Sequence, residues 1–219
     1  MIDFDEMVEN FLRRESRPKT VGRYYPSEIG SCLRKVWYSY KHPRETDIEL
    51  TKIFEVGNLI HDFVSKVIES EKNPHVELIE KELPLKLETK DFVVSGRLDD
   101  MLLLKEDGRK VLVEVKSTKT TEFTKEPSRS HAMQLQLYMH ITGVHDGVVL
   151  YVDKNNLKSK AFAVRYDEEA AKEIINRFIE LNICLVTGEL PLDEAKRDPA
   201  LMWMCRYCEY AAMCDKNEK

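Results

Sequence analysis

Residues 96–118, GRLDDMLLLKEDGRKVLVEVKST, contain two apolar runs joined by a short charged turn. Side chains alternate between the two faces of a β-strand, so Glu114 and Lys116 project from one face and the valines of residues 111–115 project from the other. The stretch therefore predicts a β-hairpin with one apolar face, which belongs to the core, and one face that carries charge.

The EDGR sequence at residues 106–109 predicts the turn of this hairpin, because Asp-Gly suits a two-residue type I′ turn. Such a turn would place Asp99 opposite Lys116 and Met101 opposite Glu114. Facing and diagonal Cβ atoms on one face lie within ~8 Å of each other. We therefore expect Asp99, Glu114 and Lys116 to form one cluster.

Two carboxylates and an ammonium on one sheet face suit a site for a hard cation. Carboxylate oxygens bind Mg²⁺ or Mn²⁺, and a lysine there orients water or offsets charge at phosphorus. The alternative is a ladder of surface salt bridges, worth ~0 to 1 kcal/mol per pair. Asp100 falls on the apolar face of the hairpin, which favours a bulge or a strand end nearby.

Composition and charge indicate the size of the folded domain, the kind of ligand it can bind and its location. With 219 residues and 42% apolar residues, the chain can bury the core of one sizeable domain. A net charge of -5 argues against a globally basic nucleic-acid binder, but residues 13–44 hold nine Lys or Arg and two Glu, and local positive charge can bind phosphate. We find no signal sequence and no apolar run approaching ~20 residues, so a cytoplasmic location is expected.

Hydrophobic periodicity predicts a mixed α/β domain flanked by terminal segments. The expected segments are a helical N-terminal region over 1–75, a core over 76–190 and a cysteine-rich segment over 191–219, packed as one compact unit. Asp47 and Ser27 are the expected N-caps of the third and second helices. Expected helices cover 4–12, 26–40, 48–71, 131–141 and 167–186, and expected strands lie within 75–118, 147–152 and 160–164.

Four short motifs, taken in order, resemble those of a known nuclease superfamily. Residues 96–99, GRLD, followed by residues 114–116, EVK, resemble the PD-(D/E)XK motif in its RecB-like form. GNLIH at 57–61 is similar to the RecB-like Gly-xxx-His motif, and QLQLY at 134–138 is similar to the Gln-xxx-Tyr motif. Taken singly, the last two motifs are more often ordinary helix patterns, but all four occur here in the family's order.

The resemblance implies a restriction-endonuclease-like core, with a central mixed sheet flanked by helices, that binds Mn²⁺ or Mg²⁺. It also implies roles for individual side chains. These are the cation ligands His61, Asp99, Glu114 and the Val115 carbonyl, the catalytic Lys116, and Gln134 and Tyr138, which contact the substrate or brace the site.

Five cysteines in a chain without export features indicate metal ligands or buried thiols, because disulfides are rare in such proteins. Cys205, Cys208 and Cys214 form a C-terminal triplet, and Cys32 lies far upstream. Four thiolates suit zinc or an iron-sulfur cluster. The division into one remote cysteine and a triplet resembles RecB-like iron-sulfur nucleases, which implies a [4Fe-4S] cluster joining the terminal segments. Cys184 has the spacing of a core position.

The whole pattern resembles the CRISPR-associated RecB-like iron-sulfur exonuclease family, the Cas four family. That resemblance implies a metal-dependent DNA exonuclease that acts on single-stranded or overhanging ends and processes spacer precursors together with the CRISPR integrase. Arg34 and Lys35, beside Cys32, are candidate DNA contacts, and a solvated helix face is the alternative. A stand-alone repair or viral recombination nuclease and a non-catalytic DNA-end-binding module stay open.

Overall fold

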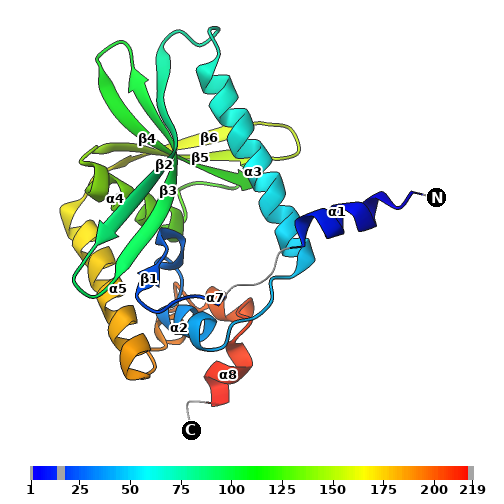
Figure 1. The fold of residues 1–219 in the computed structure, drawn as a ribbon. Helices are drawn as coiled ribbons and strands as arrows, with labels where there is room; N and C mark the ends of the chain where they lie inside the picture. The colour runs from blue at the N-terminus through cyan, green and yellow to red at the C-terminus, as the bar shows by residue number, and fades with distance from the viewer. Residues whose placement is uncertain (1, 14–17, 217–219) are drawn as a thin grey trace.

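A six-stranded mixed sheet forms the centre of the molecule (Figure 1). The computed structural model describes residues 2–13 and 18–216. Strand order is β1-β3-β4-β5-β6, with β2 also paired to β3, and the β1–β3 and β4–β5 pairs are parallel. The strands are β1 (Arg23–Tyr24), β2 (Val76–Glu88), β3 (Val93–Leu104), β4 (Arg109–Thr118), β5 (Asp146–Asp153) and β6 (Ser159–Arg165).

Helices precede, interrupt and follow the strands. In the described ranges, no helix is long and apolar enough to cross a membrane. The helices are α1 (Phe4–Leu12), the 3₁₀ helix η1 (Pro26–Glu28), α2 (Leu33–Lys41), α3 (Ile48–Glu69), α4 (Arg129–Thr142), α5 (Glu168–Thr187), α6 (Glu194–Arg197), α7 (Trp203–Arg206) and α8 (Ala211–Lys216).

The long helices begin and end where capping chemistry predicts. The Asp47 side chain accepts the amide of Glu49 at the start of α3, as expected from the sequence. Gly188, at φ +82°, ends α5 in the left-handed conformation that glycine tolerates best. The expectation for Ser27 was wrong: this residue lies inside η1, and Cys32 is the N-cap of α2.

The β3–β4 turn is longer than the sequence predicts. Leu104 pairs with Arg109, so residues 105–108 form the turn in place of two residues. A type I′ turn needs positive φ at both central residues, whereas here Gly108 has it, at +72°, and Asp107 does not. The predicted pairing of Asp99 with Lys116 was therefore wrong by two residues.

Two helical layers enclose the sheet. From one face, Ile60 and Val64 of α3 pack against Val113 and Val115 of β4. From the other face, Leu135 and its neighbours on α4 pack against the sheet, and α5 packs outside α4. Figure 1 shows α3 on one side of the sheet and α4 and α5 on the other. The α3–sheet–α4 sandwich leaves the end of β4 between two helices.

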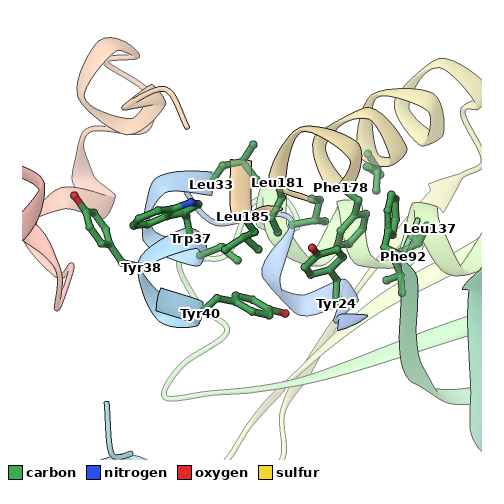
Figure 2. Close-up of a cluster of buried hydrophobic side chains, with 14 of the residues drawn as sticks. Tyr24, Leu33, Trp37, Tyr38, Tyr40, Phe92, Leu137, Phe178, Leu181 and Leu185 are labelled. Carbon is green, nitrogen blue, oxygen red and sulfur yellow. The ribbon is translucent and has the colours of Figure 1, made fainter. Parts of the chain in front are cut away.

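An aromatic core joins the two ends of the chain beside this sandwich (Figure 2). Tyr24 of β1 stacks on Phe178 of α5 and contacts Phe92, the residue just before β3. Tyr38 of α2 stacks on Tyr210, which lies between α7 and α8. The N-terminal and C-terminal segments therefore share one buried cluster with α5.

Candidate active site

The candidate site lies where β3 and β4 separate. Their antiparallel pairing ends at Asp100 and Val113, and β4 continues alongside β5 to Thr118. Past the last pair, the Val115 amide has no β3 carbonyl to bind and donates instead to Asp99 Oδ2, at 2.7 Å. The fork in the sheet thus positions the first candidate carboxylate.

A continuous chain of polar contacts runs from Glu114 to α4. Lys116 Nζ lies 2.6 Å from Glu114 Oε1 and donates to Gln134 Oε1 at 3.4 Å. Gln134 Nε2 donates to the Tyr138 hydroxyl at 3.2 Å, and that hydroxyl donates to the Arg97 carbonyl at 2.9 Å. The two residues of the Gln-xxx-Tyr motif therefore connect the lysine to β3.

His61 reaches the same cluster from α3. Its Nδ1 lies 3.2 Å from Asp99 Oδ1. Burial alone would lower the pKa of His61, but the hydrogen bond to Asp99 and the charge of that carboxylate raise it above the ordinary value. Two strands and two helices thus bring together His61, Asp99, Glu114, Lys116, Gln134 and Tyr138.

Glu114 is the most deeply buried carboxylate of the cluster, at 1% exposure. Burial and the charge of Asp99 raise the pKa of Glu114 to about 7, although Lys116 opposes them. Its Oε2 has no hydrogen-bond partner among the described residues. A buried carboxylate oxygen left without a donor, beside a second carboxylate and an imidazole, fits the ligand chemistry of a divalent cation.

Asp100 is the next carboxyl along β3 and faces away from this cluster. It is fully buried, and its Oδ1 accepts the Ser65 hydroxyl of α3 at 2.8 Å. Burial raises its pKa, which favours the neutral carboxylic acid that an apolar layer tolerates. β2 shifts register between Leu78 and Glu80, close to the β3 stretch that carries Asp100, so an irregular pairing lies nearby, as the sequence suggested.

Sequence reasoning missed His131. Its Nδ1 lies 2.7 Å from the Tyr151 hydroxyl, which also accepts the Ser128 amide. Burial and the charge of Lys116 lower the pKa of His131 to about 4, so the ring is neutral beside the lysine. His131 precedes Gln134 by three residues, a spacing that places both on one face of α4 and could have indicated it.

Four of the five cysteines surround a second feature, a cavity of about 170 Å³. Cys32 at the start of α2 lines it together with Cys205, Cys208 and Cys214 of the C-terminal segment. Burial and the neighbouring thiols raise the pKa of Cys205, as expected for sulfur atoms gathered at one place. Cys184 does not line this cavity and packs, half-buried, against the aromatic core.

The gathered thiols match the donor set of a cluster or zinc, but they are not a finished metal site. Throughout the described chain, no group of three or more His, Cys, Asp or Glu side chains is arranged as a metal-binding set, and this holds for His61, Asp99 and Glu114 as well as for the thiols. The structure therefore places the cysteines together, and the nature of any bound group stays a prediction.

Arg34 and Lys35 contact the C-terminal segment. Arg34 donates to the Pro191 carbonyl at 2.9 Å, and Lys35 pairs with Glu209 at 3.1 Å. Both residues line the cysteine cavity, and their proposed contact with DNA stays a prediction. Of the basic stretch over residues 13–44, residues 14–17 lie outside the described ranges.

Comparisons with known proteins identify the family of the chain. A family model described as the PD-(D/E)XK nuclease superfamily matches residues 63–215, a range that includes Asp99, Glu114 and Lys116 but begins after His61. The chain is 21% identical over 218 residues to the CRISPR-associated exonuclease Cas4 of Saccharolobus solfataricus, and the alignment covers 95% of this chain and 98% of that protein.

Two solved structures share the fold. The crystal structure of SSO0001 superposes with a TM-score of 0.61 at 19% identity and covers 96% of this chain and 92% of its own. The alkaline exonuclease LHK-Exo from Laribacter hongkongensis gives a TM-score of 0.53 at 14% identity, with 77% and 90% covered. At these identities the likeness shows that the overall fold is shared.

Proposed function

The chain belongs to the PD-(D/E)XK nuclease superfamily, and from this membership we propose that it is a metal-dependent exonuclease acting on single-stranded or overhanging DNA ends. The observation that carries the proposal is the connected cluster at the strand fork. There Asp99 accepts the Val115 amide, and Lys116 contacts both Glu114 and Gln134. The exonuclease activity in the names of two relatives supports the same reaction class.

The residues that would hold Mg²⁺ or Mn²⁺ are His61, Asp99, Glu114 and the Val115 carbonyl. The partnerless Oε2 of Glu114 supports this assignment, because a buried anionic oxygen without a donor is costly unless a cation satisfies it. When bound, such a cation supplies the Lewis acid that phosphodiester hydrolysis requires.

Neighbouring side chains fix the position of the Lys116 ammonium in the candidate site. Lys116 is anchored by Glu114 on one side and Gln134 on the other, so its ammonium has a fixed position from which to offset charge developing on a phosphate. Tyr138, fully buried and bound to the Arg97 carbonyl, braces Gln134. Gln134 and Tyr138 thus act on the reaction through the lysine.

For the cysteine cavity we propose a [4Fe-4S] cluster held by Cys32, Cys205, Cys208 and Cys214. Its part is structural, since hydrolysis transfers no electrons. A cluster there would connect the start of α2 to the C-terminal segment, next to the aromatic core that already joins them.

The pathway we propose is CRISPR adaptation, in which the enzyme would trim spacer precursors in company with the CRISPR integrase. Similarity to the S. solfataricus relative along nearly the whole chain supports this pathway. Copurification of the tagged chain with an integrase encoded in the same genome tests it. Reproducible absence of the integrase from such preparations would favour a stand-alone repair nuclease.

The decisive test of the chemistry is cleavage of end-labelled single-stranded and overhang DNA with Mn²⁺ or Mg²⁺. Glu114→Gln keeps the shape of the buried side chain but removes its charge, and we expect a loss of activity of at least ~100-fold. Glu106→Gln, on the exposed turn between the same strands, is the control and should retain full activity. Equal activity in the two variants would disprove the assignment of Glu114.

A further inference from the structure

An exposed aromatic residue stands on the loop that follows β4. Phe123 is 78% exposed. It occupies the tip of a turn in which the Thr124 amide donates to the Thr121 carbonyl at 3.2 Å, while Thr121 is buried. The loop is therefore anchored on the protein and directs one large apolar ring into solvent.

The backbone on both sides of Phe123 is held by a single lysine. Lys160 of β6 donates from Nζ to the carbonyls of Glu122 and Thr124, each at 3.0 Å. Fixing both flanking residues limits the freedom that an exposed ring would lose on binding, so less entropy is lost when a ligand contacts it. The arrangement presents the ring in a preorganised position.

This loop connects the two elements that carry the candidate site. It leaves β4 two residues after Lys116 and enters α4 shortly before His131 and Gln134. Because Lys116 and Gln134 are in contact, both ends of the loop are fixed at the cluster. A polymer bound at the strand fork would have this loop beside it.

The two loops that meet beside Phe123 carry an excess of positive charge. Asn155 of the β5–β6 turn donates to the Lys119 carbonyl at 2.7 Å, so residues 119–129 and 154–160 form one joined surface, which we term the loop pair. The loop pair holds six Lys or Arg and two Glu, whereas the whole chain has a net charge of -5. Such a local excess of cations attracts a phosphate backbone.

We propose that the loop pair is a binding platform for the DNA strand and that Phe123 stacks on an unpaired base next to the cleaved end. The inference rests on the proposed nuclease function and specifies its substrate as unpaired DNA at that position. A base in a duplex has both faces covered by its neighbours, whereas an unpaired base offers a face to an aromatic ring. The cations of the loop pair other than Lys160 contact the DNA backbone, and the ring adds the preference for unpaired bases.

The test compares two labelled strands of equal length, oligodeoxythymidine and the same strand with abasic sites throughout. Binding is measured by fluorescence anisotropy in the Glu114→Gln background, so that the strand stays intact. The background protein should bind the thymidine strand more tightly than the abasic strand. Phe123→Ala should weaken binding of the thymidine strand by roughly 5- to 150-fold and leave binding of the abasic strand unchanged.

Two further variants guard against a trivial loss of structure. Phe123→Trp should retain the preference for thymidine, because an indole ring also stacks. Phe11→Ala is the control, because it removes a ring of similar exposure, 81%, from α1. This variant should bind both DNA strands with the same affinities as the background protein. Unchanged thymidine affinity in Phe123→Ala would overturn this inference alone, whereas failure of the background protein to bind either strand would overturn the proposed function with it.

Discussion

Two glycines of the site region serve different purposes. A Cβ at Gly96 would lie 2.7 Å from both the Pro26 ring and the Tyr138 hydroxyl, which is closer than such atoms can approach. A Cβ at Gly57 would lie 3.6 Å from Ser117 Oγ, an ordinary contact. Gly96 therefore permits the tyrosine of the candidate site to reach β3, and Gly57 has no such steric role.

We predict opposite effects on stability for the two alanine substitutions. Gly96→Ala should lower the free energy of unfolding by ~1 to 3 kcal/mol, because Tyr138 or Pro26 has to move. Gly57→Ala should raise it by up to ~1 kcal/mol, because alanine favours the interior of α3. Urea unfolding followed by circular dichroism measures both. Destabilisation by Gly57→Ala comparable to that of Gly96→Ala would contradict this view.

Among the elements, α5 fixes the terminal segments through one mostly buried side chain. Arg177 donates to the Ile29 and Ser31 carbonyls ahead of α2 and to both carboxylate oxygens of Glu194 on α6. Glu194 in turn accepts the Leu33 amide at the start of α2, at 2.8 Å. One ion pair thus satisfies backbone groups from segments that are far apart in the sequence.

Removing one partner of the Arg177–Glu194 pair should destabilise the protein. We expect Arg177→Met to lower the free energy of unfolding by about 3 kcal/mol, because it leaves a half-buried carboxylate and two carbonyls without their donor. Lys172→Met, which removes an exposed cation from the same helix, is the control and should leave stability unchanged. Thermal unfolding of the two variants compares them directly, and an equal effect would show that Arg177 contributes as an ordinary surface charge.

The same pair sets a pH dependence with a definite sign. Burial alone would raise the pKa of Glu194, but Arg177 and the Leu33 amide lower it below the ordinary value. Its stabilising contribution is therefore present above about pH 4.3, the pKa of an unfolded glutamate, and is lost as pH falls through the lower, folded value. The stability difference between the wild type and Glu194→Gln should shrink over that acid range.

The hairpin shows how far sequence can predict this fold. The pairing was wrong by two residues, because the length of the turn depends on a backbone conformation at Asp107 that the Asp-Gly pair does not enforce. Asp99 and Glu114 nevertheless lie close enough for the charge of Asp99 to act on Glu114, since an even shift keeps each side chain on its own face. Alternation fixes the faces of a strand more strongly than turn chemistry fixes its register.

Contacts between remote segments were beyond a single sequence. No local pattern indicates that His131 would meet Tyr151, because their contact depends on how α4 crosses β5. The start of α2 at Leu33 was also missed. There Gly30, ahead of α2, packs against Ser130 so closely that a Cβ would lie 2.2 Å from its Cα, a tertiary contact that no local pattern indicates. The His131–Tyr151 contact and the Gly30–Ser130 contact both depend on tertiary packing.

At the scale of the whole molecule, the cysteine cavity connects regions that otherwise meet through the aromatic core. It lies between α2 and the C-terminal segment. The candidate active site lies elsewhere, at the fork between β3 and β4. A group bound in the cysteine cavity would stabilise the packing of the terminal segments. Removing that group would therefore reduce cleavage only indirectly, through the loss of this packing.

We predict that Cys208→Ala gives protein with reduced iron and sulfide content, lower colour and a lower unfolding temperature. Cys184→Ala, outside the cavity, should match the wild type in colour and iron content. Anaerobic purification followed by iron and sulfide analysis provides the readout. Full iron content in Cys208→Ala, or zinc in the wild type in place of iron, would disprove the cluster assignment.

The aromatic core also dictates an order of assembly during synthesis. Tyr24 bonds Asn182 across 158 residues, and Tyr210 bonds the His42 carbonyl across 168. The aromatic rings of the first forty residues therefore leave the ribosome long before their partners on α5 and the C-terminal segment exist, while strands β1 to β6 can pair once β6 has emerged. A nascent chain halted before α5 would hold a formed sheet and exposed aromatic rings on α2, which makes the interval before release the period in which this protein most needs a chaperone.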